Sequence, residues 1–326
     1  MARADLLVKL VKSAKSGDKL LFNKVVESLI ADERNKQHHV LAKQLEEVLH
    51  TYNGSTNGTK SLNGLPDEKL ESFLLNIIPK KTLDDLVLKN NNLKVVQEFI
   101  LEHRRSDLLR TYNLEPRNRV LLVGEPGNGK TSLAEAIAEA LSIPFFVIRY
   151  DGIIGSYLGE TASRLKKMFD FIKTQHCILF FDEFDAIGKE RGDIHETGEI
   201  KRVVSSLLLQ IDSLPSYVIS IAATNHPELL DRAVWRRFQI RLRLDKPDPK
   251  LIEGWLKKFE QQLEKPLGHP IKTIASKLKG LSFAEVEDFC LDIQRKYILS
   301  LPEAKLKDIV NSCLADLSNK YKLRNG

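Results

Sequence analysis

Apolar positions form short continuous runs in the middle of the chain and helical repeats on both sides of it, and this contrast predicts the fold. Four runs are continuous and rich in β-branched or aromatic residues, as in strands buried on both faces; they lie at 120–123, 144–149, 177–181 and 217–223. The segment 132–141, between the first two, is rich in strong helix formers. Strands that alternate with helices in this way predict an α/β fold with a parallel sheet.

The C-terminal part of the chain shows helical periodicity instead of continuous runs. We predict four helices there, over 251–263, 271–278, 282–299 and 302–321. Ser282 and Glu285 have the spacing of a capping box at the start of the third. We therefore predict two domains in this part of the chain, a large α/β domain over 82–246 and a helical lid with C-terminal helices over 247–326.

Three further helical patterns within residues 1–50 predict a small N-terminal helical bundle. The run from Thr51 to Leu65 is rich in glycine, asparagine, serine and threonine and lacks apolar periodicity, so we expect a loop there. Residues 66–78 are predicted to form one more helix, which leads into the core. The linker and this helix together span 51–81.

A phosphate-binding loop follows the first buried run. Residues 124–131 match the pattern of Gly, four residues and Gly-Lys-Thr, between a predicted strand and a predicted helix. In such a loop backbone N–H groups and a helix N-terminus face an anion, the lysine reaches the β- and γ-phosphates, and the threonine binds Mg²⁺. A chance glycine-rich turn is the alternative. We predict a nucleoside triphosphate site formed by Gly124, Pro126, Gly127, Asn128, Gly129, Lys130, Thr131 and Ser132.

Two adjacent carboxylates, Asp182 and Glu183, end the buried run 177–181. The carboxyl end of a strand in an open α/β sheet faces the ligand crevice. Asp182 is therefore predicted to bind the Mg²⁺ of the nucleotide, directly or through water. Glu183 is placed to accept a proton from an attacking water. The alternative is an acidic pair that only caps the next helix.

The run 217–223 is followed by Asn225 and, after a helical segment, by Arg236-Arg237-Phe238. With the two motifs above, these residues resemble the AAA family of ATPases over roughly residues 82–300. The resemblance implies ATP as the nucleotide, hydrolysed with Mg²⁺. It makes Asn225 the sensor that holds the water, and Arg236 and Arg237 the arginine fingers that reach the γ-phosphate of a neighbouring subunit.

A guanidinium suits the finger role because it is always charged and can bridge two oxygens. The alternative for Arg236 and Arg237 is solvation of a helix end. Their adjacency resembles the Arg-Arg-Phe form of the spastin and katanin branch. Which of the two arginines dominates stays open.

An aromatic–hydrophobic–glycine triplet, Tyr157-Leu158-Gly159, lies on the predicted loop between the run 144–149 and the next helix. In AAA protein unfoldases a triplet at this place lines the central pore of the hexamer and grips a polypeptide. An exposed aromatic ring on a glycine-flanked loop offers a large, sequence-tolerant contact area. The alternative is that Tyr157 packs at a helix start. A second polar loop, 188–199, is expected to face the same pore.

The resemblance therefore implies a homo-hexamer that uses ATP hydrolysis to remodel or unfold a protein client threaded through its ring. The alternative function is a nucleotide-dependent switch or loader that acts on DNA or on a partner without threading. The pore triplet favours the first function, and the modest basicity slightly favours the second.

Two further segments resemble the parts of the family that contact adenine. Asp84-Asp85-Leu86-Val87 aligns with the stretch before the phosphate loop, and Gly280 to Val286 aligns with a segment of the small helical domain. Family members usually carry glycine where this chain has Phe283. Whether the second segment contacts adenine stays open for that reason.

No zinc-protease motif accompanies the likeness to the ATPase part of membrane-bound AAA metalloproteases, which is close between Ser163 and Gly192. Those proteins bind zinc with a His-Glu-x-x-His sequence on a helix. The only His-Glu pair here is His195-Glu196, and position 199 holds Glu199. Any protease that degrades the clients is expected to be a separate polypeptide. Bacterial AAA proteins of this type that are paired with a subtilisin-like serine protease suggest such a partner.

Composition indicates which partners and which cellular compartment to expect. The net charge of +6 is spread along the sequence, so nucleic acid is not indicated as a partner. Three cysteines without framework spacing favour a reducing compartment. No apolar run approaches the roughly 18–20 residues of a membrane span, and acidic residues such as Asp5 and Asp18 argue against a mitochondrial presequence. We expect a cytoplasmic protein with no membrane contact.

Overall fold

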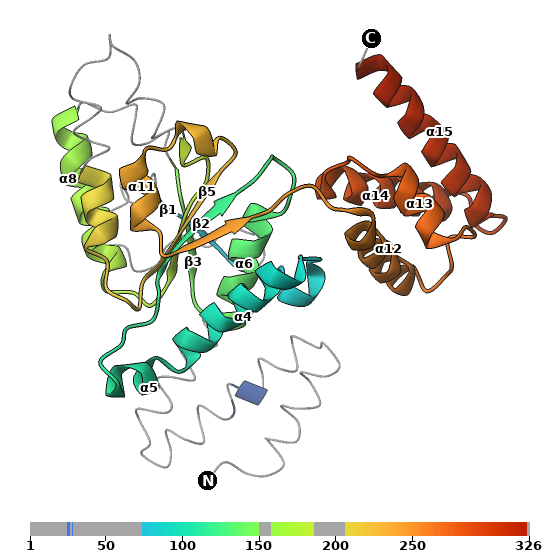
Figure 1. Ribbon diagram of the computed structural model, residues 1–326. Helices are drawn as coiled ribbons and strands as arrows, with labels where there is room; N and C mark the ends of the chain where they lie inside the picture. Colours follow the sequence, from blue (N-terminus) through green and yellow to red (C-terminus); the bar gives the residue numbers. More distant parts are fainter. Residues whose placement is uncertain (1–24, 27, 29–73, 150–157, 186–205, 325–326) are drawn as a thin grey trace. The chain divides into compact units, whose positions relative to one another are not determined.

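The computed structural model describes residues 25, 26, 28, 74–149, 158–185 and 206–324. The chain divides into two compact units, 1–63 and 64–326. Apart from those three residues, the predicted N-terminal bundle and the linker lie outside the described part. The second unit contains a sheet with its covering helices and a group of C-terminal helices (Figure 1).

Six strands form one sheet in the order β1-β3-β4-β5-β2-β6. Their bounds are β1 Leu74–Ile77, β2 Arg119–Val123, β3 Phe145–Ile148, β4 Ile178–Phe181, β5 Ile219–Thr224 and β6 Ile240–Arg243. All neighbouring pairs from β3 to β6 are parallel. The residues of β4 and β5 are buried throughout, as the continuous apolar runs predicted. The predicted α/β fold with a parallel sheet is confirmed.

The prediction of a helix over residues 66–78 is wrong for Leu74–Ile77, which form the edge strand β1. This strand pairs antiparallel with β3, with Leu74 opposite Ile148 and Ile77 opposite Phe145. Periodicity cannot separate a short apolar run in a strand from one in a helix. The unpaired edge of β3 decides the outcome, because it offers the run a ladder of backbone hydrogen bonds.

Helices α6 (Lys130–Leu141) and α4 (Asn90–Arg104) cover one face of the sheet (Figure 1). They share a hydrophobic cluster with alternate residues of the strands, among them Val120, Phe145 and Ile221. Helix α8 (Leu158–Ile172) packs on the opposite face, where Phe171 meets Phe146 edge to face. The sheet is thus a middle layer between helices.

Helix α4, the short α5 (Ser106–Thr111) and strand β6 were not predicted from the sequence. In β6 the residues Ile240 and Leu242 are buried and alternate with exposed arginines. That alternation is the signal of a half-buried strand that could have identified it.

The C-terminal helices pack around a hydrophobic cluster of their own, with Leu256, Ile274, Val286 and Val310 at its centre. They are α12 Pro249–Leu263, α13 Ile271–Lys277, α14 Phe283–Leu299 and α15 Leu306–Arg324. The four predicted helices are confirmed, and so is the capping box of Ser282 and Glu285. In the described part of the chain no helix has the length and apolar character to cross a membrane.

Candidate active site

The loop between β2 and α6 has the backbone shape of an anion site. Gly129 lies in the left-handed region with a φ of 82° and stands directly before the first turn of α6. A side chain would strain this conformation, whereas glycine adopts it freely. The helix N-terminus and its free N–H groups therefore point toward the loop, as phosphate binding requires.

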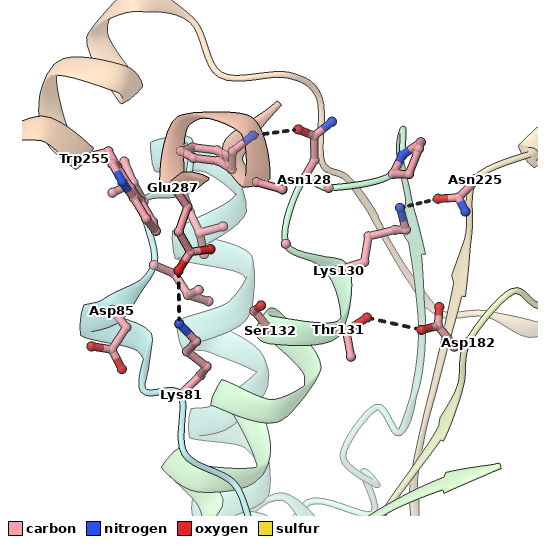
Figure 2. A pocket seen from close by; sticks show the side chains of 18 of the residues that line it. Lys81, Asp85, Asn128, Lys130, Thr131, Ser132, Asp182, Asn225, Trp255 and Glu287 are labelled. Carbon is pink, nitrogen blue, oxygen red and sulfur yellow. Dashed lines mark hydrogen bonds and ion pairs between the residues drawn. The ribbon is translucent and has the colours of Figure 1, made fainter. Parts of the chain in front are cut away.

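Lys130 lies inside this loop with its side chain almost wholly buried. Its ammonium group donates to the carbonyl oxygens of Gly124 (2.8 Å) and Glu125 (3.0 Å) and to Oδ1 of Asn225 (2.5 Å; Figure 2). Burial lowers the pKa of Lys130, and the nearby carboxylates of Asp182 and Asp185 oppose that shift. The lysine from the β2 end and the asparagine from the β5 end thus share one polar cluster.

Thr131 and Asp182 come together beside this cluster. The Thr131 hydroxyl donates to Oδ2 of Asp182 across 3.3 Å (Figure 2). Carboxylate and hydroxyl oxygens are hard ligands of the kind that Mg²⁺ prefers, so the pair fits this ion. Among the described residues no group of three or more His, Cys, Asp or Glu side chains could hold a metal. Mg²⁺ characteristically needs only one or two protein ligands besides phosphates and water.

Glu183 is held in an uncommon backbone conformation, with a φ of 48°. The turn that contains it is pinned to β5, because the N–H of Phe184 donates to the Ala223 carbonyl across 2.8 Å. The Thr224 hydroxyl also donates to the buried carboxylate of Asp185 across 2.8 Å. These contacts hold the exposed Glu183 at the pocket wall. Left-handed non-glycine residues gather at functional sites, where surrounding structure compensates the strain.

Asp185 was not predicted from the sequence. In the sequence it is one more acidic residue, three positions after Asp182, and nothing in the local pattern distinguishes it from an exposed one. Its burial and its hydrogen bond to Thr224 are seen only in the structure.

The pocket lined by Lys130, Thr131 and Asp182 has a volume of about 320 Å³. Besides the phosphate loop, Asp182, Glu183 and Asn225, two further segments line it (Figure 2). The first contributes Lys81, Asp85, Leu86, Val87 and Leu88. The second comes from the C-terminal helices and contributes Trp255, Phe283, Ala284 and Glu287. Of the segment 84–87, Asp84 is not in the lining, while Lys81, Trp255 and Glu287 were missed because they belong to no local motif.

Arg236 and Arg237 are not among the residues that line this pocket. They end helix α11 (Arg232–Arg237), whose N-cap Asp231 accepts a hydrogen bond from the N–H of Val234. Arg237 donates to Asp212 across 2.8 Å and to the carbonyl of Ala233 across 2.9 Å. Arg236 is exposed. The two arginines therefore differ in surroundings, although they are adjacent in sequence.

The predicted pore loop is only partly described. Tyr157 and the second loop, 188–199, lie outside the described residues. Leu158 and Gly159 are the first residues of α8, so the prediction that the loop contains them is wrong. The helix begins earlier than the glycine pattern indicated. Intrinsic helix propensity is a weak guide to where a helix begins, because the packing of later turns can outweigh it.

Comparison with known proteins agrees with this geometry. Residues 120–246 match the model of the ATPase family associated with various cellular activities (AAA). The uncharacterised AAA family ATPase y4kL of Sinorhizobium fredii is 37% identical over 320 residues, which cover 97% of this chain and 96% of that protein. The chain belongs to the AAA family of ATPases. This AAA protein is an ATP hydrolase, and AAA ATPases bind ATP, typically with Mg²⁺, and are typically oligomeric.

Two other relatives match the ATPase part alone. A putative 26S proteasome regulatory subunit homolog of Methanothermobacter thermautotrophicus is 32% identical over 176 residues, 53% of this chain and 47% of that protein. The ATP-dependent zinc metalloprotease FtsH 4 of Synechocystis is 35% identical over 221 residues, 63% of this chain and 35% of that protein. The chain spans less than half the length of these two relatives. The expected resemblance to the AAA family and to the ATPase core of AAA proteases is confirmed.

Proposed function

We propose that this AAA ATPase couples ATP hydrolysis to the remodelling or unfolding of protein clients, which are threaded through a ring of six copies. The names of the two partial relatives connect them with proteolysis, one as a proteasome regulatory subunit homolog and one as a protease. Since each match covers only part of either protein, their likeness supports a protein client without naming it.

In the proposed mechanism the phosphate loop and Lys130 bind the β- and γ-phosphates. Thr131 and Asp182 hold Mg²⁺, which supplies charge neutralisation at the phosphates. Glu183 accepts a proton from the attacking water, and Asn225 orients that water. The hydrogen bond of 2.5 Å between Lys130 and Asn225 supports this assignment, because the amide of Asn225 lies directly beside the ammonium group of Lys130.

The observation that carries the threading proposal is the place of the Tyr157-Leu158-Gly159 triplet in the topology. It follows β3, which is parallel to β2 through β4 and β5, so both strands end at the same edge of the sheet. Three strand spacings separate β3 from β2, about 14 Å in all. The chain segment that carries the triplet is therefore joined through β3 to the same edge of the sheet at which β2 ends.

The arginine pair supports assembly into a ring. Arg236 and Arg237 do not line the pocket of their own chain. In other nucleotide hydrolases an arginine supplied by a neighbouring protein stabilises the charge of the transition state. Head-to-tail contacts that close on themselves produce rings. We therefore infer a homo-hexamer. We further propose that it works in the cytoplasm, that the region 1–50 selects clients, and that a separate subtilisin-like protease is its partner.

The second candidate function is a nucleotide-dependent switch or loader that acts on DNA or a partner without threading, favoured only by the net charge of +6. Measuring ATP turnover with an unfolded polypeptide, with duplex DNA and with neither separates the two. Threading predicts stimulation by the polypeptide and ATP-dependent unfolding of a tagged fluorescent protein. Stimulation by DNA alone, with no unfolding, would favour the loader and contradict threading.

A further inference from the structure

Thr224, the last residue of β5, makes three hydrogen bonds at the edge of the sheet where the pocket lies. Its hydroxyl donates to Oδ1 of Asp185 across 2.8 Å and accepts from the N–H of His226 across 3.0 Å. Its carbonyl accepts from the N–H of Gly124, in the phosphate loop, across 3.2 Å. One residue thus joins the phosphate loop, the turn after β4 and the segment that carries Asn225.

The hydroxyl of Thr224 helps to hold the backbone of Asn225. The hydrogen bond from the His226 N–H closes a short turn around Asn225, because its donor and its acceptor belong to the residues on either side. The amide oxygen of Asn225 in turn accepts from Lys130 across 2.5 Å. The position of this amide therefore depends on the Thr224 side chain as well as on β5.

The turn that carries Glu183 is bonded to the same end of β5. The N–H of Phe184 donates to the carbonyl of Ala223 across 2.8 Å. The carboxylate of Asp185 accepts from Thr224, so two successive residues of the turn bind two successive residues of the strand. Glu183 has a left-handed φ of 48°, a conformation that persists only where the surrounding structure supports it. These two contacts provide such support.

The contact between Asp185 and Thr224 is enclosed by protein. Only 7% of Asp185 and none of Thr224 is exposed. A buried carboxylate destabilises the fold unless it is hydrogen-bonded, and an enclosed hydrogen bond is stronger than one in water. The carboxylate is also near enough to Lys130 to oppose the lowering of the pKa of Lys130 by burial. The pair is therefore a firm link that lies beside the phosphate loop.

We infer that Asp185 and Thr224 are positioning residues for ATP hydrolysis, and that their hydrogen bond keeps Glu183 and Asn225 at the separation that the attacking water needs. Neither residue is among those that line the pocket, so both act through their neighbours. The inference rests on the roles proposed above for Glu183 and Asn225 and not on threading. Positioning matters for rate, because a misplacement of about 1 Å can slow an enzyme roughly 100-fold.

Thr224→Val tests the link, because it removes the hydroxyl and keeps the shape of the side chain. In the full-length chain we expect kcat to fall about 10- to 100-fold and the Kd for ATP to stay within about threefold. Thr224→Ser restores the hydroxyl and should keep most of the parent kcat. Ser220→Ala is the matched control, since it removes another buried hydroxyl of β5 and should leave kcat unchanged. Parent kcat in Thr224→Val would overturn the inference.

A double variant separates positioning from packing. Thr224→Val alone leaves the Asp185 carboxylate buried without this partner, which destabilises the fold, whereas removal of both partners relieves that cost. Thr224→Val with Asp185→Ala should therefore resist thermal denaturation better than Thr224→Val and still hydrolyse ATP slowly. Recovery of the parent kcat together with stability would reduce the pair to a structural contact and contradict the inference.

Coupling to Asn225 gives a third readout. If Thr224 acts partly through Asn225, the fall in kcat for Thr224→Val with Asn225→Ala should be clearly smaller than the product of the two single effects. Two independent effects, whose product describes the double variant, would reject the positioning inference alone. Parent kcat in Asn225→Ala by itself would reject the role proposed for Asn225, and the inference with it.

Discussion

Lys130 and Asn225 are joined by a hydrogen bond of 2.5 Å between ammonium group and amide oxygen, although 95 positions separate them in the chain. The contact exists because β2 and β5 are neighbours in the sheet and both residues follow the carboxyl ends of these strands. The ammonium group and the amide are thus positioned by one pair of strands.

Glu183→Gln should retain ATP binding and stall hydrolysis. The amide cannot accept the proton of the attacking water, and loss of a general base costs about 10²- to 10⁴-fold in rate. Turnover is measured by phosphate release and binding by equilibrium titration with ATP. Hydrolysis at the parent rate would show that Glu183 is not the base.

Lys130→Ala and Asn225→Ala should separate binding from chemistry. The first removes the charge that we propose contacts the phosphates, so ATP affinity should fall about 10- to 150-fold. The second should lower turnover and leave affinity within a few-fold, since the amide acts on the water. Paired ATP titrations and kcat measurements check this, and a larger loss of affinity for Asn225→Ala than for Lys130→Ala would reverse the two roles.

Arg236→Ala and Arg237→Ala should differ in stability although both lower ATP turnover. Arg237 loses its partly buried ion pair with Asp212, which also pairs with Arg119, and the expected cost is about 1 kcal/mol. Arg236 is exposed, so its removal should leave thermal denaturation unchanged. Asp212→Asn removes the ion pairs with both Arg237 and Arg119, so it should lose at least as much stability as Arg237→Ala does. Equal destabilisation by both alanine variants would remove the distinction.

Mixing two inactive proteins should restore part of the activity if the arginines act across subunits. Subunits with Lys130→Ala keep their arginines, and subunits with Arg236→Ala and Arg237→Ala keep their nucleotide site. Mixed interfaces then join one intact site to one intact arginine pair. ATP turnover of the mixture is compared with that of each variant alone. Parent turnover by a proven monomer would contradict the trans arrangement.

Tyr157→Ala should abolish client unfolding and the stimulation of ATP turnover by a client, if this ring grips the polypeptide. Tyr157→Phe should be mild, because the ring face and its area persist. A packed tyrosine would instead cost the alanine variant roughly 3–5 kcal/mol of stability. Thermal denaturation of both variants distinguishes these cases, and a stable alanine variant that still unfolds clients would exclude the grip.

Local motifs in the sequence determine the nucleotide chemistry of this protein. The phosphate loop works through adjacent backbone N–H groups, one lysine and one threonine, all within residues 124–131, so its geometry is encoded locally. The continuous runs of β2, β4 and β5 likewise predict buried parallel strands, because a strand covered on both faces must be apolar throughout. The class of fold and the placement of Asp182 and Glu183 at strand ends follow from these features.

Only the tertiary structure showed the features that depend on contacts between distant parts of the chain. Leu74–Ile77 became a strand because β3 had an open edge. Trp255 and Lys81 line the pocket although their segments carry no motif. Arg237 differs from Arg236 in its surroundings because Asp212 lies within reach of Arg237. Each of these outcomes is set by contacts between residues far apart in the chain, whereas periodicity and propensity report only on neighbours within a few positions.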